Sequence, residues 1–572
     1  MNRRDWDHPP RFVDADADMG DAAVAEAYYR ELNDRPLHTA DALNRWLLDG
    51  SELESCLDEE GSTRYVEMTC HTNDAGRERR YLDFIEQIVP LAKTWSNKLD
   101  RKLLDCPHRS SLPADRFGVL LRRIENRVRL FREENVALQT EDDRLRQQYQ
   151  KLTGGLTVSY RGGERTMQQM AQYLEEDDRA VREETWGLVK DKWAEVRDDI
   201  ETLYDRMVRT RHRMAHNAAL PDYRDYAFRH LERFDYTPAD CIAFAGAIER
   251  RIVPAAKSLA DERRTRLAVE TLRPWDLAVD PEGRSPLRPF ATAAELVAGC
   301  GRIFARVDAE LAGQFEHMMA AGLLDLESRK GKAPGGYMMD YKGRRLPFIF
   351  MNAVGTQRDV ETLLHEGGHA FHVFAARDEP IAALRDAPIE FAEVASMGME
   401  LLSAPYLEAF YEPADAERAR RRQLRDIVNF FPFMATIDQL QHWVYTHPTH
   451  GREERKQAWL ELNRRFVPWI DYRGHADALA YAWHRKGHPF TVPFYYVEYG
   501  IAQLGALGVW VGSQRDRMAA VAAYRRALAL GGSRPLPELF AAAGLRFDFS
   551  ESTVEPAIGA IEMALRDGSE LR

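Results

Sequence analysis

The sequence contains few cysteines, and none of them forms a recognisable pair. Five cysteines are scattered through 572 residues, and no Cys-x-x-Cys motif occurs among them. Small proteins that depend on disulfides carry an even number of closely spaced cysteines. We therefore expect free thiols in a reducing compartment at Cys56, Cys70, Cys106, Cys241 and Cys300.

Long apolar runs and a positive net charge are also missing. No uninterrupted apolar segment reaches the ~18 residues that a membrane span needs. Residues 1–7 carry charges where a signal peptide would be apolar. The formal net charge is −12, which argues against general nucleic-acid binding. These absences predict a cytoplasmic protein with neither a membrane nor a nucleic-acid partner.

The composition and the hydrophobic patterning indicate a large helical protein. Hydrophobic residues make up 45% of the chain, as in folded globular proteins. Amphipathic patterns at 83–106, 115–150 and 177–217 predict long helices, whereas the strand-like segments are short. We predict a mainly α fold with a boundary near residue 200, which separates an N-terminal helical portion, 1–200, from a catalytic portion, 201–572.

The strongest chemical signal is a His-Glu-x-x-His pattern formed by His365, Glu366 and His369. Residues four apart on a helix lie on the same face, with Cβ atoms about 5–6 Å apart, so both imidazoles can reach one metal ion. Glu366 can then reach a metal-bound water and act as a general base. Thr356 as N-cap and Asp359 in the first turn predict the helix that this spacing requires. The pattern predicts a zinc site.

Two glycines interrupt this helix between its histidines. Gly367 and Gly368 each cost a helix roughly 1 kcal/mol relative to alanine. Glycine is tolerable there if another backbone must come close. We therefore expect a second helix or a substrate backbone to approach the helix at this point.

A third metal ligand is expected on the following helix. A catalytic zinc normally takes three protein ligands and keeps its fourth position for water. Asp386 can cap a helix over 386–396, with Pro388 in its first turn. Glu390 and Glu393 are three apart and share a side of this helix, so spacing alone leaves both open, with a weak preference for Glu393.

Several motifs together resemble those of the oligoendopeptidase F and thimet-oligopeptidase family of zinc metallopeptidases, and in particular its Pz-peptidase-like branch. In that family an aromatic residue precedes the glutamate ligand by two positions and a serine follows it by three. The resemblance therefore selects Glu393 over Glu390. It rests on the segments 329–337, 347–352, 365–369, 391–396 and 493–500, together with His488.

The resemblance also implies the architecture. Two helical portions would enclose a deep substrate channel, with one zinc ion per chain on its floor and a small sheet beside the zinc-binding helix. We interpret residues 347–352 as the strand of that sheet, with an edge that faces the substrate and pairs with its backbone. A channel of this kind would admit oligopeptides and exclude folded proteins.

A cluster of polar aromatic residues lies about 120–130 residues after the zinc motif in the sequence. Tyr496 and Tyr499 are three apart, so their hydroxyls would project to one side of a helix, and a buried tyrosine hydroxyl needs a partner. In the family that this chain resembles, a histidine and a Tyr-x-x-Tyr pair contact the substrate carbonyl. By that resemblance we expect Tyr499 to be the main oxyanion donor, assisted by His488 and Tyr496.

The function predicted is hydrolysis of internal peptide bonds in short peptides by a zinc-dependent oligopeptidase. Two alternatives stay open. A carboxypeptidase of related helical architecture would need a cation that fixes the substrate carboxylate. A catalytically silent peptide-binding protein would not need the intact set His365, Glu366, His369 and Glu393.

Overall fold

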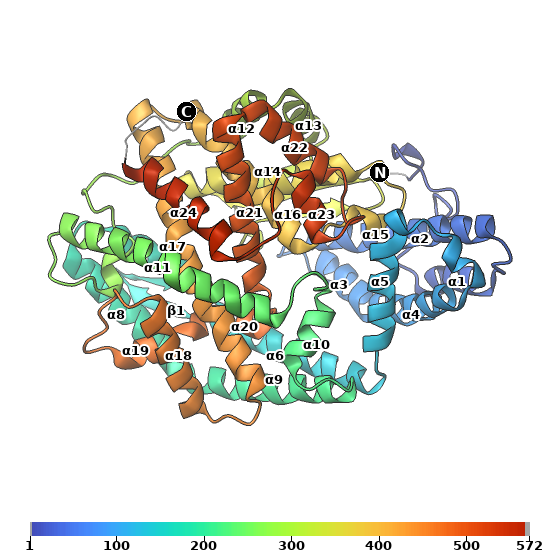
Figure 1. The fold of residues 1–572 in the computed structure, drawn as a ribbon, viewed down its shortest axis with the longest axis horizontal. Coiled ribbons are helices and arrows are strands. Elements are labelled where there is room, and N and C mark those ends of the chain that lie inside the picture. The colour runs from blue at the N-terminus through green and yellow to red at the C-terminus, as the bar shows by residue number, and fades with distance from the viewer. Residues whose placement is uncertain (1–2, 567–572) are drawn as a thin grey trace.

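The computed structural model describes residues 3–566 and is mainly helical (Figure 1). The helices between residues 22 and 130, drawn in blue, form one group with an apolar core of their own, which includes Trp46, Leu99 and Phe117. These helices are α1 (Ala22–Asp34), α2 (Ala40–Cys70), α3 (Ala75–Asp83), α4 (Val89–Asp105) and α5 (Ala114–Leu130).

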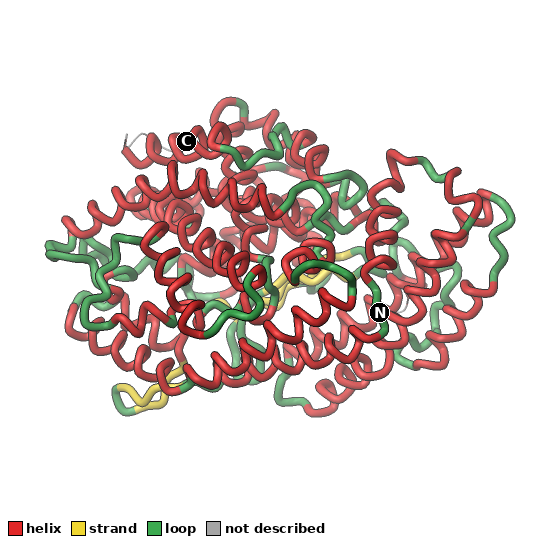
Figure 2. Tube along the Cα trace, turned by 60° about the horizontal axis from the view of Figure 1, so that its bottom comes forward, coloured by secondary structure: helices red, strands yellow, loops and turns green. Residues whose placement is uncertain are grey.

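Most helices after residue 130 share a second and larger apolar core. Among the exceptions are the short helix that contains Leu384, which joins the first core, and the short helix that contains Met170, which packs with a β-hairpin. The single helix predicted over 115–150 is divided in two, because Phe131 adopts an extended conformation at φ −62° and ψ 129°. The β-hairpin projects from the edge of the helices (Figure 2). The elements of this part are α6 (Glu134–Gly154), β1 (Thr157–Tyr160), β2 (Gly163–Thr166), α7 (Met167–Ala171), α8 (Arg179–Glu195), α9 (Arg197–Asn217), α10 (Tyr223–His230), α11 (Pro238–Arg266), α12 (Ala293–Val307) and α13 (Ala309–Ala320).

A three-stranded sheet lies among these helices (Figure 2). In the sequence it comes directly before the helix with the histidine motif. The strand order is β3-β5-β4; β5 pairs in parallel with β3 and antiparallel with β4. The sheet and the helices that follow it are β3 (Leu324–Glu327), β4 (Tyr337–Tyr341), β5 (Leu346–Ala353), α14 (Gln357–Ala376), α15 (Ala382–Arg385) and α16 (Ile389–Ser403).

The C-terminal helices complete the second core around α16, which packs against both α14 and α21. Gly505 on α21 illustrates the contact, since a Cβ there would lie 2.7 Å from Val394 on α16. The remaining elements are α17 (Pro413–Thr446), α18 (Arg452–Phe466), α19 (Ala476–Ala480), α20 (His488–Thr491), α21 (Tyr496–Arg515), α22 (Arg517–Leu528), α23 (Leu536–Ala542) and α24 (Glu551–Arg566).

The structure confirms that the cysteines are unpaired. All five are buried free thiols. Over residues 3–566, no helix combines the length and the apolar character that crossing a bilayer would require. The boundary predicted near residue 200 stays a prediction.

Candidate active site

The helix that carries the histidine motif begins as the sequence predicts. The hydroxyl of Thr356 accepts a hydrogen bond from the backbone N–H of Asp359, and the Asp359 carboxylate accepts one from the N–H of Thr356 at 2.8 Å. This reciprocal cap satisfies backbone donors that the first turn of a helix leaves unpaired. It fixes the start of α14 and so the face on which the motif lies.

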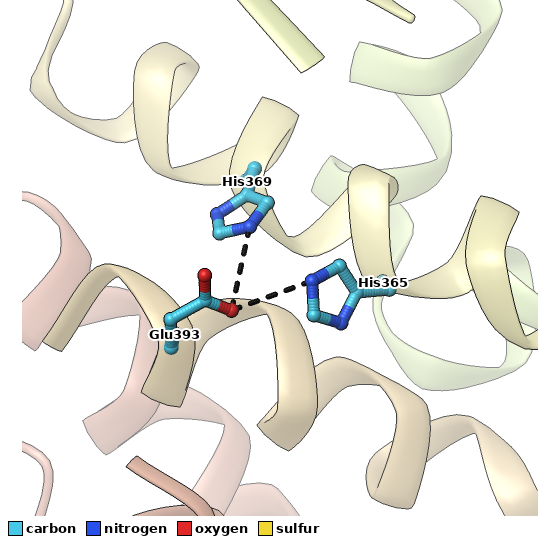
Figure 3. A group of neighbouring side chains, drawn as sticks. All are labelled: His365, His369 and Glu393. Atoms are coloured by element: carbon cyan, nitrogen blue, oxygen red, sulfur yellow. Dashed lines mark ion pairs between the residues drawn. The ribbon is translucent and has the colours of Figure 1, made fainter. Parts of the chain in front are cut away.

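Three side chains from two helices converge on one point (Figure 3). Nε2 of His365 lies 3.4 Å from Oε2 of Glu393, and Nε2 of His369 lies 3.7 Å from the same oxygen. All three donor atoms lie within 4.8 Å of one another. Zinc with bonds of about 2.0–2.2 Å in tetrahedral geometry holds neighbouring donors roughly 3.3–3.6 Å apart. The two distances from Glu393 to the histidines are close to this range, and two histidines with one glutamate are a donor set that zinc takes.

The charges at this point also indicate a place for a cation. Burial disfavours a charged His365, but hydrogen bonds to Glu393 and Glu400 outweigh it and hold the pKa of His365 well above its usual range. Burial likewise raises the pKa of Glu393, but the hydrogen bond with His365 outweighs it and lowers that pKa to about 2. Burial lowers the pKa of His369 to about 4. A metal ion binds the neutral imidazole and the ionised carboxylate, so binding here would release the proton that His365 otherwise holds.

Two further side chains orient these donors. The Nδ1–H of His365 donates to Oε1 of Glu400 at 2.7 Å, and the hydroxyl of Ser396 donates to Oε2 of Glu393 at 2.9 Å. Such contacts fix the ring orientation of a ligating histidine and raise its basicity. Glu400 was not predicted from the sequence, although it lies seven residues after Glu393 on the same helix face.

Glu390, the alternative third ligand, is directed elsewhere. The hydroxyl of Tyr236 donates to Oε1 of Glu390 at 2.5 Å, and Glu390 is only 3% exposed. The cap predicted for this helix is wrong: Asp386 pairs with Lys342, and Pro388 occupies the N-cap position. The helix therefore starts at Ile389. Its packing against α14 places Glu393, and not Glu390, beside the histidines.

The two glycines of α14 allow α16 and α12 to come close. A Cβ at Gly368 would lie 2.5 Å from the carbonyl oxygen of Ala395 and 2.6 Å from Cα of Ser396, both on α16. A Cβ at Gly367 would lie 2.7 Å from the Phe304 ring on α12. This confirms the expected approach of a second helix, which brings Glu393 within reach of the histidines.

Glu366 occupies a buried position beside the donors and is 8% exposed. Burial is the main reason that its pKa is raised to about 7, with His365 lowering it and Glu393 raising it. The backbone of Met338 on β4 has a smaller effect, opposite to that of burial, and lowers this pKa. A carboxyl group with a pKa near neutral pH can both accept and release a proton there.

The strand predicted to offer its edge to the substrate lies in the centre of the sheet. β4 pairs with β5 over residues 346–350 and β3 pairs with its other side over 349–353, so β5 is the central strand and not an edge strand. Its residues, including Phe348 and Phe350, are buried. The strand at the edge beside Glu366 is β4. The prediction of an edge at residues 347–352 is therefore wrong.

The predicted cluster of polar aromatic residues also assembles. The ring centroids of His488 and Tyr496 lie 4.8 Å apart, those of His488 and Tyr499 lie 5.8 Å apart, and those of the two tyrosines lie 5.9 Å apart. Burial and then the Glu393 carboxylate raise the pKa of Tyr499 to about 12. Of these three side chains, Tyr499 is therefore the one whose pKa responds to the charge of Glu393. Burial lowers the pKa of His488 to about 4, which leaves its imidazole neutral at pH 7.

A buried arginine fixes the start of the helix that carries the tyrosines. Arg233 donates to the carbonyl of Phe494 at 2.5 Å and to the carboxylate of Glu498 at 2.8 Å. Phe494 has φ of 68°, a left-handed conformation that is strained for a bulky residue, and its N–H donates to Gln441 at 2.6 Å. Sequence reasoning did not find Arg233, because it acts through a backbone carbonyl.

Comparison with known proteins identifies the family of this chain. The model of peptidase family M3 matches residues 172–556, and that of the peptidase M3 N-terminal domain matches residues 12–131. The chain therefore belongs to peptidase family M3, which confirms the resemblance inferred from the motifs.

Curated relatives with similar sequences are oligopeptidases of the same kind by name. An oligoendopeptidase F homolog of Mycoplasma pneumoniae is 28% identical over 47% of this chain and 46% of its own length. Oligopeptidase PepF of Bacillus subtilis is 25% identical over 46% of this chain and 40% of its own. The chain thus aligns with less than half the length of these curated relatives.

The solved structures match over nearly the whole chain. Pz peptidase A, in a structure with an inhibitor, superposes with a TM-score of 0.90 at 28% identity, over 98% of this chain and 100% of that one. Oligoendopeptidase F from Enterococcus faecium shares the fold, with a TM-score of 0.65 at 15% identity, over 96% of this chain and 98% of that one.

Proposed function

We propose that this protein is a zinc-dependent oligopeptidase that hydrolyses internal bonds of short peptides. The carrying observation is the convergence of His365, His369 and Glu393, whose donor atoms lie within 4.8 Å of one another beside Glu366. These three residues would hold one zinc ion per chain. When bound, the zinc supplies a Lewis acid for the scissile carbonyl and makes water a better nucleophile near neutral pH.

Glu366 is the general base in this proposal. Its carboxylate takes a proton from the attacking water and then passes it to the leaving amine. A pKa of about 7, raised by burial, suits both transfers. The backbone of Met338, on the edge strand β4, affects the pKa of this carboxylate, and β4 is the proposed place for an extended substrate backbone to pair.

Tyr499 is the proposed main donor to the oxyanion. Charge develops on the carbonyl oxygen as water attacks, and a hydroxyl already directed at that position stabilises it without reorganisation. Burial and the Glu393 carboxylate raise the pKa of Tyr499 to about 12, so its hydroxyl remains protonated over the working pH range. His488 and Tyr496 are proposed to assist it.

Oligopeptides are the proposed substrate class, taken into a channel between the N-terminal and the catalytic portion. The cytoplasm is the proposed location. The test is an internally quenched peptide with both ends blocked. An endopeptidase cleaves it and releases internal fragments that mass spectrometry identifies. A carboxypeptidase leaves it intact but trims the same peptide with a free carboxyl end, and a silent binding protein cleaves neither.

A further inference from the structure

Lys486 carries a positive charge beside the side chains proposed to stabilise the oxyanion. Its Nζ lies 4.1 Å from the centre of the Tyr496 ring. The same ring lies 4.8 Å from His488 and 5.9 Å from Tyr499, measured between centroids. The ammonium group therefore contacts a ring that is itself 5.9 Å from the ring of the main donor.

This ammonium group has no anionic partner among residues 3–566. No carboxylate in that part of the chain lies within 4.0 Å of its Nζ. Its side chain is half-buried. Burial lowers the pKa of Lys486 to about 8, and no acidic group counteracts this effect. A half-buried cation with no counter-ion is costly unless a ligand supplies the anion.

Other inward-facing lysines are compensated. Lys332 bonds to Asp325 at 2.9 Å, and Lys342 bonds to Asp340 at 2.9 Å. Lys102 donates to three backbone carbonyls, those of Leu32 at 2.8 Å, Asn33 at 2.6 Å and Arg35 at 2.5 Å. The fold therefore satisfies comparable ammonium groups elsewhere but leaves this one unpaired next to the site.

We propose that Lys486 binds a carboxylate of the peptide substrate, an inference that rests on the proposed peptidase function. An extended chain advances about 3.3–3.6 Å per residue. The distance from Nζ to the centre of the Tyr496 ring is 4.1 Å, and the distance from that ring to Tyr499 is 5.9 Å; together they equal the length of about three extended residues. The carboxylate is thus an Asp or Glu side chain, or the chain end, within about three residues of the cleaved bond.

Binding can be measured without cleavage in the zinc-loaded Glu366→Gln protein. The first set of probes is pairs of peptides with both ends blocked. The two members of a pair differ by Glu or Gln at one of the three positions on either side of the bond. The second set is one Gln peptide, prepared with a free or with an amidated carboxyl end. Calorimetry measures the affinity of each peptide for the Glu366→Gln protein. The measurement is repeated with double variants that combine Glu366→Gln with Lys486→Gln, Lys486→Arg or Lys98→Gln. Lys98 is the matched control, because its Nζ lies 3.9 Å above the Trp95 ring in the N-terminal core, away from the site.

We expect one carboxylate peptide to bind about ten- to a hundred-fold more tightly than its neutral counterpart. Lys486→Gln should abolish that difference, whereas Lys486→Arg and Lys98→Gln should preserve it. A difference in affinity between the Glu and the Gln peptide identifies a side-chain carboxylate as the group bound. A difference in affinity between the free and the amidated peptide identifies the carboxyl end of the chain. Equal affinities for all pairs, or a difference that survives Lys486→Gln, would overturn the assignment to Lys486. Failure of the wild-type zinc protein to cleave any of these peptides would instead refute the peptidase function.

Discussion

Replacing Gly368 by alanine tests how the third ligand is brought to the histidines. The new Cβ would lie 2.5 Å from the Ala395 carbonyl oxygen, whereas ordinary contacts begin at 3.4 Å. Both atoms belong to helix backbones, so α16 must move away by about 1 Å. Glu393, two residues before Ala395, moves with it. Metal ligands tolerate only about 0.2 Å of displacement, so we expect zinc affinity to fall at least about 100-fold.

Two matched glycine variants isolate this effect. Gly367→Ala meets only the Phe304 side chain at 2.7 Å, so it should cost about 1–3 kcal/mol of unfolding free energy through overpacking but leave α16 and zinc affinity unchanged. Gly118→Ala, in α5, meets nothing within 4 Å and should add up to about 1 kcal/mol of stability from helix propensity.

The assay is zinc titration of the metal-free proteins against a competing chelator, with urea unfolding measured in parallel. Wild-type zinc affinity in Gly368→Ala, together with a gain in stability like that of Gly118→Ala, would refute the close-approach reasoning. Loss of zinc affinity in Gly367→Ala as large as in Gly368→Ala would show that packing around α14 in general, and not the contact with α16, controls the site.

Three further outcomes are expected. Tyr499→Phe should lower kcat about 10²–10³-fold with zinc content and KM nearly unchanged; steady-state kinetics with a near-normal kcat would transfer the role to Tyr496 or His488. Glu393→Ala should lose zinc and Glu390→Ala should retain it, as measured by metal analysis, and the reverse result would mean that the third ligand is misassigned. Peptides of modest length should be cleaved, whereas unfolded chains of the size of casein should survive. Gel electrophoresis measures this survival, and efficient digestion of the long chains would contradict a narrow channel.

The catalytic helix could be predicted because its signals are local. The Thr356 cap, the four-residue spacing of His365 and His369 and the two glycines lie within one short segment. The choice between Glu390 and Glu393 could not be made from spacing, since residues three apart share a helix side. Tertiary packing separates them, with Tyr236 bonding Glu390 and α14 lying against the turn after Glu393.

The features that sequence reasoning missed depend on contacts between distant segments. An apolar run such as residues 347–352 is typical of a strand covered on both sides, but only the strand order shows that β4 forms the edge. Arg233 lies about 260 positions before the helix it fixes and bonds a backbone carbonyl there, so no motif connects the two. Glu400 did leave a signal, because it repeats the position of Glu393 after two helical turns.

The most direct test of the proposed mechanism is the zinc content and the turnover of one Glu366→Gln preparation beside wild type, with a quenched peptide blocked at both ends. We predict one zinc per chain in both proteins. We also predict that the variant loses about 10²–10⁴-fold in kcat, because the proton acceptor is removed while His365, His369 and Glu393 remain. A Glu366→Gln protein that retains its zinc and cleaves at the wild-type rate would contradict the mechanism.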